Sequence, residues 1–202
     1  MLSLKKQIYT LEEYLELDHE SEERIEFWDG HVFTLAGASN NHDQIQSNAH
    51  FFLRLKLQGK PCRVFLSEMR VKVPEYPPYR YPDLSVYWGE GVYETMDGLE
   101  VLTNPQMIIE VLSLSTEAFD RGEKFTYYKS IPSFTEYLLV ATNRPNITQF
   151  IKRSESEWVH REANGLEATL SLGAFAAELL LSEIYLDIEF PEPKSNLLLV
   201  DR

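Results

Sequence analysis

The sequence predicts an α/β protein in which a central mixed β-sheet is flanked by helices, and three observations predict it. Residues 107–112 and 135–141 are short runs of apolar side chains, which are typical of buried strands. A helix pattern lies between them, over residues 116–130. A longer amphipathic segment, at residues 42–57, precedes this strand–helix–strand unit. The alternation of strands with helices favours layers of helix packed on sheet.

The N-terminal segment predicts a short helix and an extra β-hairpin. Thr10 and Glu13 have the spacing of a capping box, so we expect a helix over residues 11–17. Residues 24–28 and 31–35 flank an Asp-Gly pair, which is typical of a two-residue hairpin turn of type I′. We therefore expect an extra N-terminal hairpin besides the central sheet.

The middle of the chain supplies further strands. Asn41 is the predicted N-cap of the helix over residues 42–57. We expect one long, bent strand at residues 62–73 and a second strand at residues 83–88. Residues 89–104 form a predicted connection that is long enough for the strands on either side of it to pair.

The last third of the chain predicts a C-terminal antiparallel meander. It follows the strand at residues 135–141 and the helix before it, which Ser115 or Thr116 would cap. Its expected strands are residues 147–151, 158–163 and 166–170. Asn164-Gly165 would supply the turn between the last two strands, and a short helix is expected at residues 182–187.

Length and composition predict a single domain over residues 1–202, with its core at about residues 10–190. The chain is 44% hydrophobic and 25% charged, as ordinary globular domains are. Its one cysteine, Cys62, excludes an intrachain disulfide and a cysteine-ligated metal cluster. The sequence shows no leader pattern and no apolar run of membrane-spanning length, so we expect a cytoplasmic protein with no membrane association.

The net charge of −13 argues against binding to nucleic acid, because DNA-binding domains usually carry an overall or local basic excess. Basic residues in the first half of the chain would offset this charge if they converged beside Asp83. They are Arg54, Lys56, Lys60, Arg63, Arg70, Lys72 and Arg80. A common basic face would favour polymeric nucleic acid as a substrate, and a scattered arrangement would not.

Two acidic residues stand beside apolar neighbours on predicted strands. Asp83 opens the strand at residues 83–88, and Glu110 lies inside the apolar run at residues 107–112. A buried carboxylate is costly unless it is paired or binds a cation. If the two strands pair, both carboxylates meet at one end of the sheet and offer oxygen ligands suited to Mg²⁺ or Mn²⁺. Lys124, on the following helix, would then hold an attacking water or stabilise charge on a phosphate.

The pattern of these residues resembles a bacterial family of restriction-endonuclease-like proteins, the Uma-two group of the PD-(D/E)XK nuclease superfamily. The matching segments are Pro82-Asp83, Ile109 to Ser113, Asp120, Lys124, Tyr127 and Glu136-Tyr137, with Arg24 to Gly30, Gly37 to Ser39 and His42 before them. The resemblance covers residues 10–190 and implies a restriction-endonuclease-like core with Asp83 and Glu110 as metal ligands. The superfamily motif has a lysine where this chain has Leu112, and the resemblance implies that Lys124 replaces it.

Supporting roles at the site are expected for five further residues: Glu26, His42, Glu68, Asp120 and Tyr127. Glu26 matches the family pattern, although strand alternation alone would make it a solvent-facing residue. His42, at a helix N-terminus, would contact phosphate or cap the helix. Glu68 interrupts the alternation of its strand and would add an acid at the end of the sheet. Asp120 and Tyr127 share one side of a helix with Lys124. The alternatives to a site role are an ion pair with Lys124 for Asp120 and core packing for Tyr127.

Three functions fit these observations. The first is a Mg²⁺- or Mn²⁺-dependent endonuclease that hydrolyses phosphodiester bonds in DNA, expected as a homodimer because two strands must be cut. The second is a catalytically decayed nuclease-fold protein that acts as a binding or assembly module, which the acidity and Leu112 favour. The third is a metal-dependent hydrolase of RNA, a nucleotide or another phosphoester.

Overall fold

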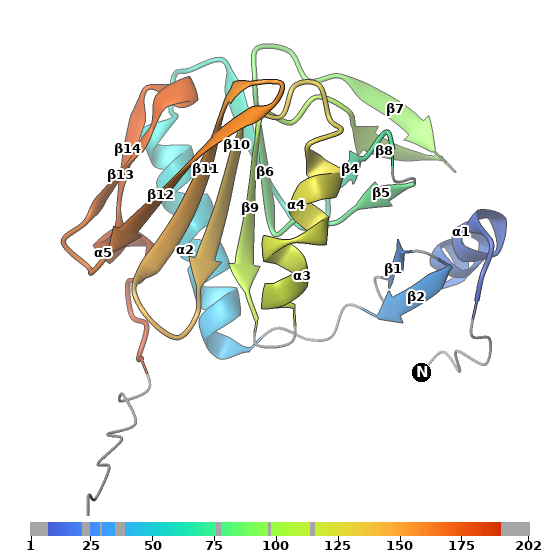
Figure 1. Cartoon of the computed structure of the whole chain (residues 1–202), viewed down its shortest axis with the longest axis horizontal. Coiled ribbons are helices and arrows are strands. Elements are labelled where there is room, and N and C mark those ends of the chain that lie inside the picture. The colour runs from blue at the N-terminus through green and yellow to red at the C-terminus, as the bar shows by residue number, and fades with distance from the viewer. Residues whose placement is uncertain are drawn as a thin grey trace, which may run out of the picture.

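The protein is built around a mixed six-stranded sheet. A computed structural model describes residues 8–190 except 22–24, 29, 35–38, 76–77, 97 and 114–115. The strands of the central sheet lie in the order β12-β11-β10-β9-β6-β3 (Figure 1). Their bounds, in this order, are Glu157–Asn164, Asn146–Ser154, Glu136–Ala141, Met107–Leu112, Leu84–Trp88 and Cys62–Leu66. β9 and β10 are parallel and the other neighbours are antiparallel, which confirms the predicted mixed sheet.

Helices cover both faces of this sheet. They are α2 (Asn40–Lys56), α3 (Glu117–Arg121) and α4 (Glu123–Tyr128). α2 lies on one face, and α3 and α4 lie on the other (Figure 1). The N-cap of α2 is Ser39, which accepts the His42 N–H at 3.3 Å, so the prediction of Asn41 is wrong. The single helix predicted over residues 116–130 is two helices, because Gly122, with φ −110° and ψ −91°, leaves the helical conformation between them.

The strand β9 divides its side chains between the two faces. Ile109 and Val111 pack in the core that includes α2, whereas Ile108 and Leu112 pack in the core that includes α4. Side chains of a strand point alternately to opposite faces, so Glu110 lies on the α4 face. The same alternation that builds the core therefore places a carboxylate beneath a helix.

A second sheet of four short strands has the order β5-β4-β8-β7. The bounds, in this order, are Tyr79–Arg80, Arg70–Lys72, Leu99–Leu102 and Tyr93–Met96. Two predictions are wrong here. The single strand expected at residues 62–73 turns after β3, where the Met69 N–H donates to the Leu66 carbonyl at 3.0 Å, and its second half joins the other sheet as β4. The connection expected at residues 89–104 contains the β7–β8 hairpin.

The N-terminal helix and hairpin are confirmed. They are α1 (Leu11–Glu20), β1 (Ile25–Trp28) and β2 (His31–Thr34). The capping box forms, with the Glu13 N–H donating to Thr10 Oγ1 at 3.2 Å and the Thr10 N–H donating to Glu13 Oε2 at 2.8 Å. In the hairpin turn, Asp29 lies outside the described residues, and Gly30 has the left-handed φ of 78° that a type I′ turn requires.

A buried polar cluster joins α1 to the second sheet. Asp18 accepts hydrogen bonds from the Tyr79 hydroxyl at 2.7 Å, the Tyr81 hydroxyl at 3.4 Å and Arg70 Nη2 at 3.1 Å. The Arg70 guanidinium also lies 5.1 Å from the centre of each of these two rings. The Asp18 side chain is 5% exposed, so its loss would leave a partly buried guanidinium without its counter-charge.

We expect Asp18→Ala to lower the free energy of unfolding by about 3 kcal/mol, because it leaves the charge of Arg70 unpaired in a poorly solvated place. Glu94→Ala, which breaks the more exposed pair with Lys72, should cost less than about 1 kcal/mol. Urea unfolding of the two variants measures the difference. Equal losses would contradict the anchoring role of Asp18.

The C-terminal meander forms only in part. β11 and β12 pair as predicted and complete the central sheet. The remaining elements are β13 (Thr169–Leu172), β14 (Ala177–Leu180) and α5 (Leu181–Ile184). β13 pairs with β14 in a separate two-stranded sheet, so the prediction that residues 166–170 continue the meander is wrong. The helix expected at residues 182–187 is α5, which is shorter and begins one residue earlier.

Candidate functional site

Asp83 and Glu110 are neighbours at one end of the central sheet. Leu84 of β6 is paired with Ile109 of the antiparallel strand β9, so the next residue pair outward is Asp83 and Glu110. The Asp83 N–H donates to Glu110 Oε2 at 3.4 Å, and Asp83 Oδ2 accepts the Val111 N–H at 2.7 Å. The predicted convergence of the two carboxylates is present.

Lys124 reaches this pair from α4. Its Nζ lies 2.9 Å from Glu110 Oε1 and 3.5 Å from Asp120 Oδ1. The Tyr128 hydroxyl, one helical turn further along, donates to the same Glu110 Oε1 at 2.8 Å. All four side chains are buried, so a lysine, two carboxylates and a phenol form a network beneath the helix.

Two of the predicted supporting residues complete the site from other elements. Glu26 of β1 is 7% exposed, and its Oε1 accepts the Tyr81 N–H at 3.0 Å, just before Asp83. His42, in the first turn of α2, places Nε2 3.3 Å from Asp83 Oδ2. Gln46, on the same helix, donates to the Asp83 carbonyl at 2.9 Å. The N-terminal hairpin and α2 therefore both fix the position of Asp83.

The buried charges perturb one another. Burial raises the pKa of Glu110 to about 8, with Lys124 opposing the rise and the carboxylates of Asp83 and Asp120 adding to it. Burial likewise raises the pKa of Asp120, again against Lys124. Burial alone would lower the pKa of Lys124, but Glu110, Glu26 and Asp120 outweigh it and hold that pKa well above 10.5, so the amine is charged.

Burial and a nearby charge also oppose each other at His42, and the net effect raises its pKa. Burial would lower this pKa, but the hydrogen bond to Asp83 and the negative charge of Asp83 outweigh it. A raised imidazole pKa favours the charged form of His42, which strengthens its contact with the Asp83 carboxylate.

The chemistry of this donor set fits a divalent cation. Within the described residues, the acids of the cluster are Glu26, Asp83, Glu110 and Asp120, and its permanent cations are Lys124 and the buried Arg80. With all four acids ionised, they exceed these cations by two charges when His42 is neutral and by one when it is protonated, and the raised pKa of Glu110 means that a proton offsets one of these negative charges below about pH 8. No three His, Cys, Asp or Glu side chains of the described residues form a complete ligand set. Two carboxylates, with water molecules in the remaining coordination positions, suit Mg²⁺, because this ion keeps several waters when proteins bind it.

The other predicted residues lie outside this network or at its edge. Glu68 is exposed in the turn after β3 and is not buried with the other acids, so the expected additional acid is not part of the cluster. Tyr127 is buried on α4, where its ring packs against Trp28 and Phe119 at centre distances of 6.2 Å and 6.1 Å. Tyr127 therefore borders the site through aromatic packing.

The site residues predicted from the sequence do not include Tyr128, and they include Arg80 only as one of seven basic residues. Tyr128 stands in a helix with several aromatic side chains, and only the structure shows that its hydroxyl bonds to Glu110. Arg80 is 1% exposed, lies 5.5 Å from the centre of the Tyr127 ring and donates to the Tyr79 carbonyl at 2.9 Å. An arginine three positions before the site aspartate was the available signal, but its burial depends on the short strand β5.

Of the basic residues of the first half of the chain, Arg80 is buried in the acidic cluster, but four others are engaged elsewhere. Lys56 pairs with Glu183 at 2.7 Å, and Arg70 pairs with Asp18 at 3.1 Å. Lys60 donates to the Phe175 and Ala176 carbonyls, and Lys72 pairs with Glu94. This scattered arrangement removes the support that a basic face would have given to phosphate-backbone binding.

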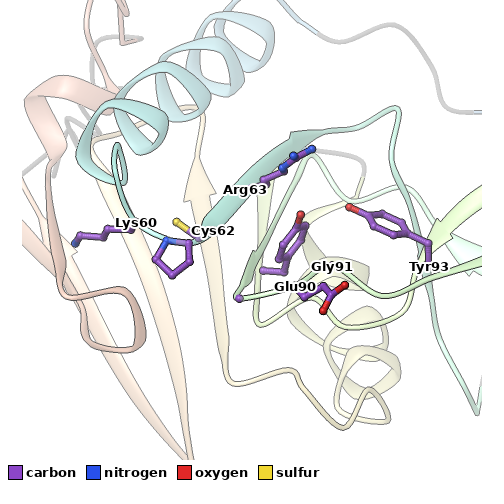
Figure 2. Close-up of a pocket in the computed structure, with 9 residues that line it drawn as sticks. Lys60, Cys62, Arg63, Glu90, Gly91 and Tyr93 are labelled. Atoms are coloured by element: carbon purple, nitrogen blue, oxygen red, sulfur yellow. The ribbon is translucent and has the colours of Figure 1, made fainter.

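A surface pocket lies at the other end of β6, away from the carboxylates. Lys60, Cys62, Arg63, Glu90 and Tyr93 line it, together with the loop at Gly89 to Gly91 (Figure 2). The Lys60 amine is already bound to main-chain carbonyls, and the pocket is open and shallow. The acidic cluster at the opposite strand end is therefore the better candidate site, because charge and perturbed pKa values converge there.

Glu136 is a second buried glutamate of the sheet, and it supplies a pH prediction. Burial raises its pKa to about 7, against the hydrogen bond that Gln149 donates to it. A folded pKa above the ordinary 4.5 means that the folded state binds more protons, so this group lowers stability as pH rises from about 4.5 to 7. The free energy of unfolding of Glu136→Gln, relative to that of wild type, should rise by about 2–3 kcal/mol between pH 5 and pH 8. Urea unfolding at the two pH values measures this change. A difference that is independent of pH would contradict this assignment.

Comparisons with known proteins identify the family of the chain. The Uma2 family model, described as "putative restriction endonuclease", matches residues 11–183. Two uncharacterised proteins of Synechocystis sp., sll1609 and slr1290, are 33% and 31% identical to this chain. The alignments cover 84% of this chain and 96% of the first protein, and 73% of this chain and 76% of the second.

A solved structure shows the same fold. The crystal structure of a putative nuclease belonging to DUF820 from Anabaena variabilis superposes with a TM-score of 0.69 at 18% identity, covering 87% of this chain and 97% of that chain. The central mixed sheet with helices on both faces is thus a restriction-endonuclease-like core, as predicted. In the described part of the chain, no helix combines the length and apolar character needed to cross a membrane. By its sequence match over residues 11–183, the chain belongs to the Uma2 family of putative restriction endonucleases.

Proposed function

We propose that the protein is a divalent-metal-dependent endonuclease that hydrolyses phosphodiester bonds in DNA, with Mg²⁺ or Mn²⁺ as the cofactor. One observation carries the proposal: Asp83 and Glu110 meet on paired strands, with the charged amine of Lys124 2.9 Å from Glu110. Two carboxylates and an amine, buried together with an excess of negative charge, are costly to maintain unless a cation offsets them. The family and the fold support a nuclease, and the site supplies the chemistry.

Asp83 and Glu110 are the residues that would hold the ion. When bound, a divalent cation lowers the pKa of a water molecule and neutralises charge on a phosphate. His42 and the Val111 N–H both bind Asp83 Oδ2 and so fix the orientation of that carboxylate. Tyr128 and Lys124 do the same for Glu110 through Oε1. These contacts preorganise the ligands before substrate arrives.

Lys124 takes the place of the lysine that the superfamily motif puts two residues after the glutamate. Leu112 occupies that position and packs in the apolar core on the α4 side of the sheet. Lys124 reaches the same carboxylate from the helix that covers this face. Its charge would offset the negative charge that develops on the phosphate during hydrolysis.

Cleavage of plasmid DNA tests the proposal. We expect cutting with Mg²⁺ or Mn²⁺ and none with a chelator, and we expect Asp83→Ala and Glu110→Ala to abolish it without unfolding the protein. A homodimer, which would bring two sites to the two DNA strands, should sediment at twice the chain mass of 23.5 kDa. Cleavage retained by both alanine variants would remove the assignment of these ligands.

The alternative function is a binding or assembly module with decayed catalysis. The scattered basic residues and the net charge of −13 favour it, because neither promotes contact with a phosphate backbone. A protein of this kind would show no cleavage with any divalent cation while keeping its fold. The response of its melting temperature to metal, described below, separates the two functions.

A further inference from the structure

The N-terminal hairpin has two chemically different faces. Ile25, Phe27 and Val32 point to one side and pack in the cluster that includes α1. The strand register pairs Glu26 with Phe33 and Trp28 with His31. Directly opposed residues of an antiparallel pair lie on the same face, so these four side chains form the other side of the hairpin. We call this side the site face, because it carries Glu26.

Aromatic rings run from solvent along the site face to α4. Phe33 is 48% exposed, and its ring centre lies 6.2 Å from that of His31 and 6.4 Å from that of Trp28. Trp28 packs on Phe119 of α3 at 4.9 Å, and Phe119 packs on Tyr127 of α4 at 6.1 Å. Phe119 directly precedes Asp120, and α4 carries Lys124. The row of rings therefore begins in solvent and ends beside the proposed catalytic residues.

We propose that the exposed end of this row binds unpaired nucleobases by stacking, so that the substrate is single-stranded or locally unpaired nucleic acid. The inference rests on the proposed nuclease function and specifies its substrate. Ring-on-base stacking tolerates any sequence, because every base has a π-face, and it contributes about 1–3 kcal/mol per base. It adds affinity that does not depend on charge, in an acidic protein where Lys56, Lys60, Arg70 and Lys72 are engaged with acids or carbonyls of the chain itself.

The position of the rings favours unpaired bases over an intact duplex. In a duplex the faces of the bases are covered by their neighbours, so a protein ring can stack only on a base that is unpaired or extruded. Phe33 and His31 lie on the exposed strand of a hairpin that also supplies Glu26 to the acidic cluster. A base held there would lie on the face of the hairpin that also carries Glu26.

Phe33 offers a clean test, because an exposed side chain can be removed with little effect on folding. Phe33→Ala is the test variant. Phe51→Ala is the matched control, since Phe51 is 61% exposed, lies on α2 and also contacts another ring, that of Phe52 at 5.1 Å. α2 covers the opposite face of the sheet from α3 and α4 (Figure 1).

The experiment is fluorescence anisotropy in the presence of a chelator, with three labelled probes of equal length: oligothymidylate, an abasic oligomer with the same phosphates, and a blunt duplex. We expect wild type to bind oligothymidylate most tightly. Phe33→Ala should weaken that binding by roughly 5- to 100-fold while leaving the abasic probe unchanged. Phe51→Ala should match wild type with every probe. An oligouridylate probe distinguishes RNA from DNA as the source of the bases.

Equal affinity of wild type for oligothymidylate and the abasic oligomer would overturn the proposal, as would tighter binding of the duplex. Unchanged binding by Phe33→Ala would also overturn it. If this variant instead converts a dimer to a monomer in sedimentation and binds oligonucleotides like wild type, the site face is a contact between copies of the chain. Because binding is measured without metal, failure of cleavage and failure of base stacking are separate results.

Discussion

Glu110→Gln should reduce metal-dependent cleavage by about 1000-fold while leaving the protein folded. A metal ligand contributes several kcal/mol to charge stabilisation, and each 1.36 kcal/mol is a factor of ten in rate. Glutamine keeps an oxygen that can accept the Tyr128 hydrogen bond, and Lys124 keeps Asp120 as a partner. The variant should therefore lose catalytic rate and keep its fold. Initial rates of plasmid cleavage at saturating Mn²⁺ measure the effect.

The matched control for this variant is Glu136→Gln. Glu136 is 2% exposed and lies on β10, the strand next to Glu110, but its partner in the register is Met107 at the start of β9. It therefore tests removal of a buried carboxylate from the same sheet without touching the site. Cleavage by Glu136→Gln should equal that of wild type. Equal losses in the two variants would mean that cleavage reports the stability of the sheet and not metal binding.

Lys124→Met should lower the free energy of unfolding by about 3–5 kcal/mol at pH 8, because it leaves Glu110 and Asp120 buried without their cation. The carboxyl groups of the variant can escape this cost only by taking up protons. Their folded pKa values then lie further above the unfolded values, so the variant loses stability as pH rises. The deficit relative to wild type should therefore shrink towards pH 5. Urea unfolding at both pH values measures it.

The double variant Lys124→Met with Glu110→Gln controls for the lost packing of the lysine stem. If the pair is coupled through charge, the double variant should be more stable than the sum of the single effects predicts, by about 1–3 kcal/mol. Additive losses would contradict the coupling and reduce Lys124 to a packing residue of α4.

The parts of the fold that the sequence predicted are those with a strong local signal. β6, β9 and β10 are buried over almost their whole length, so their apolar runs are visible without any knowledge of their neighbours. The Thr10 capping box and the hairpin turn at Gly30 depend on nearest neighbours in sequence and were equally readable. Asp83 and Glu110 were found because each interrupts or borders such a run.

The errors fall where tertiary contacts decide the structure. β7 has side chains that are half-buried or exposed in no clear alternation, so the hairpin within residues 89–104 left no periodic pattern. The turn after β3 and the helix break at Gly122 depend on which sheet or core receives the next segment. The hydrogen bond of Tyr128 and the burial of Arg80 depend on residues distant in sequence, which no local pattern reveals.

The central claim is that Asp83 and Glu110 together bind one divalent cation, and the melting temperature in Mg²⁺ and Mn²⁺ tests it most directly. A cation present at about 100 times its Kd stabilises the folded state by about 2.7 kcal/mol, which for a chain of this size raises the melting temperature by about 5–10 °C. We expect that rise in wild type at pH 8, where the proton on Glu110 competes less with the metal than it does at lower pH. Asp83→Asn and Glu110→Gln should each lose it, and Glu136→Gln should keep it. No rise in wild type, or an equal rise in the two site variants, would contradict the account.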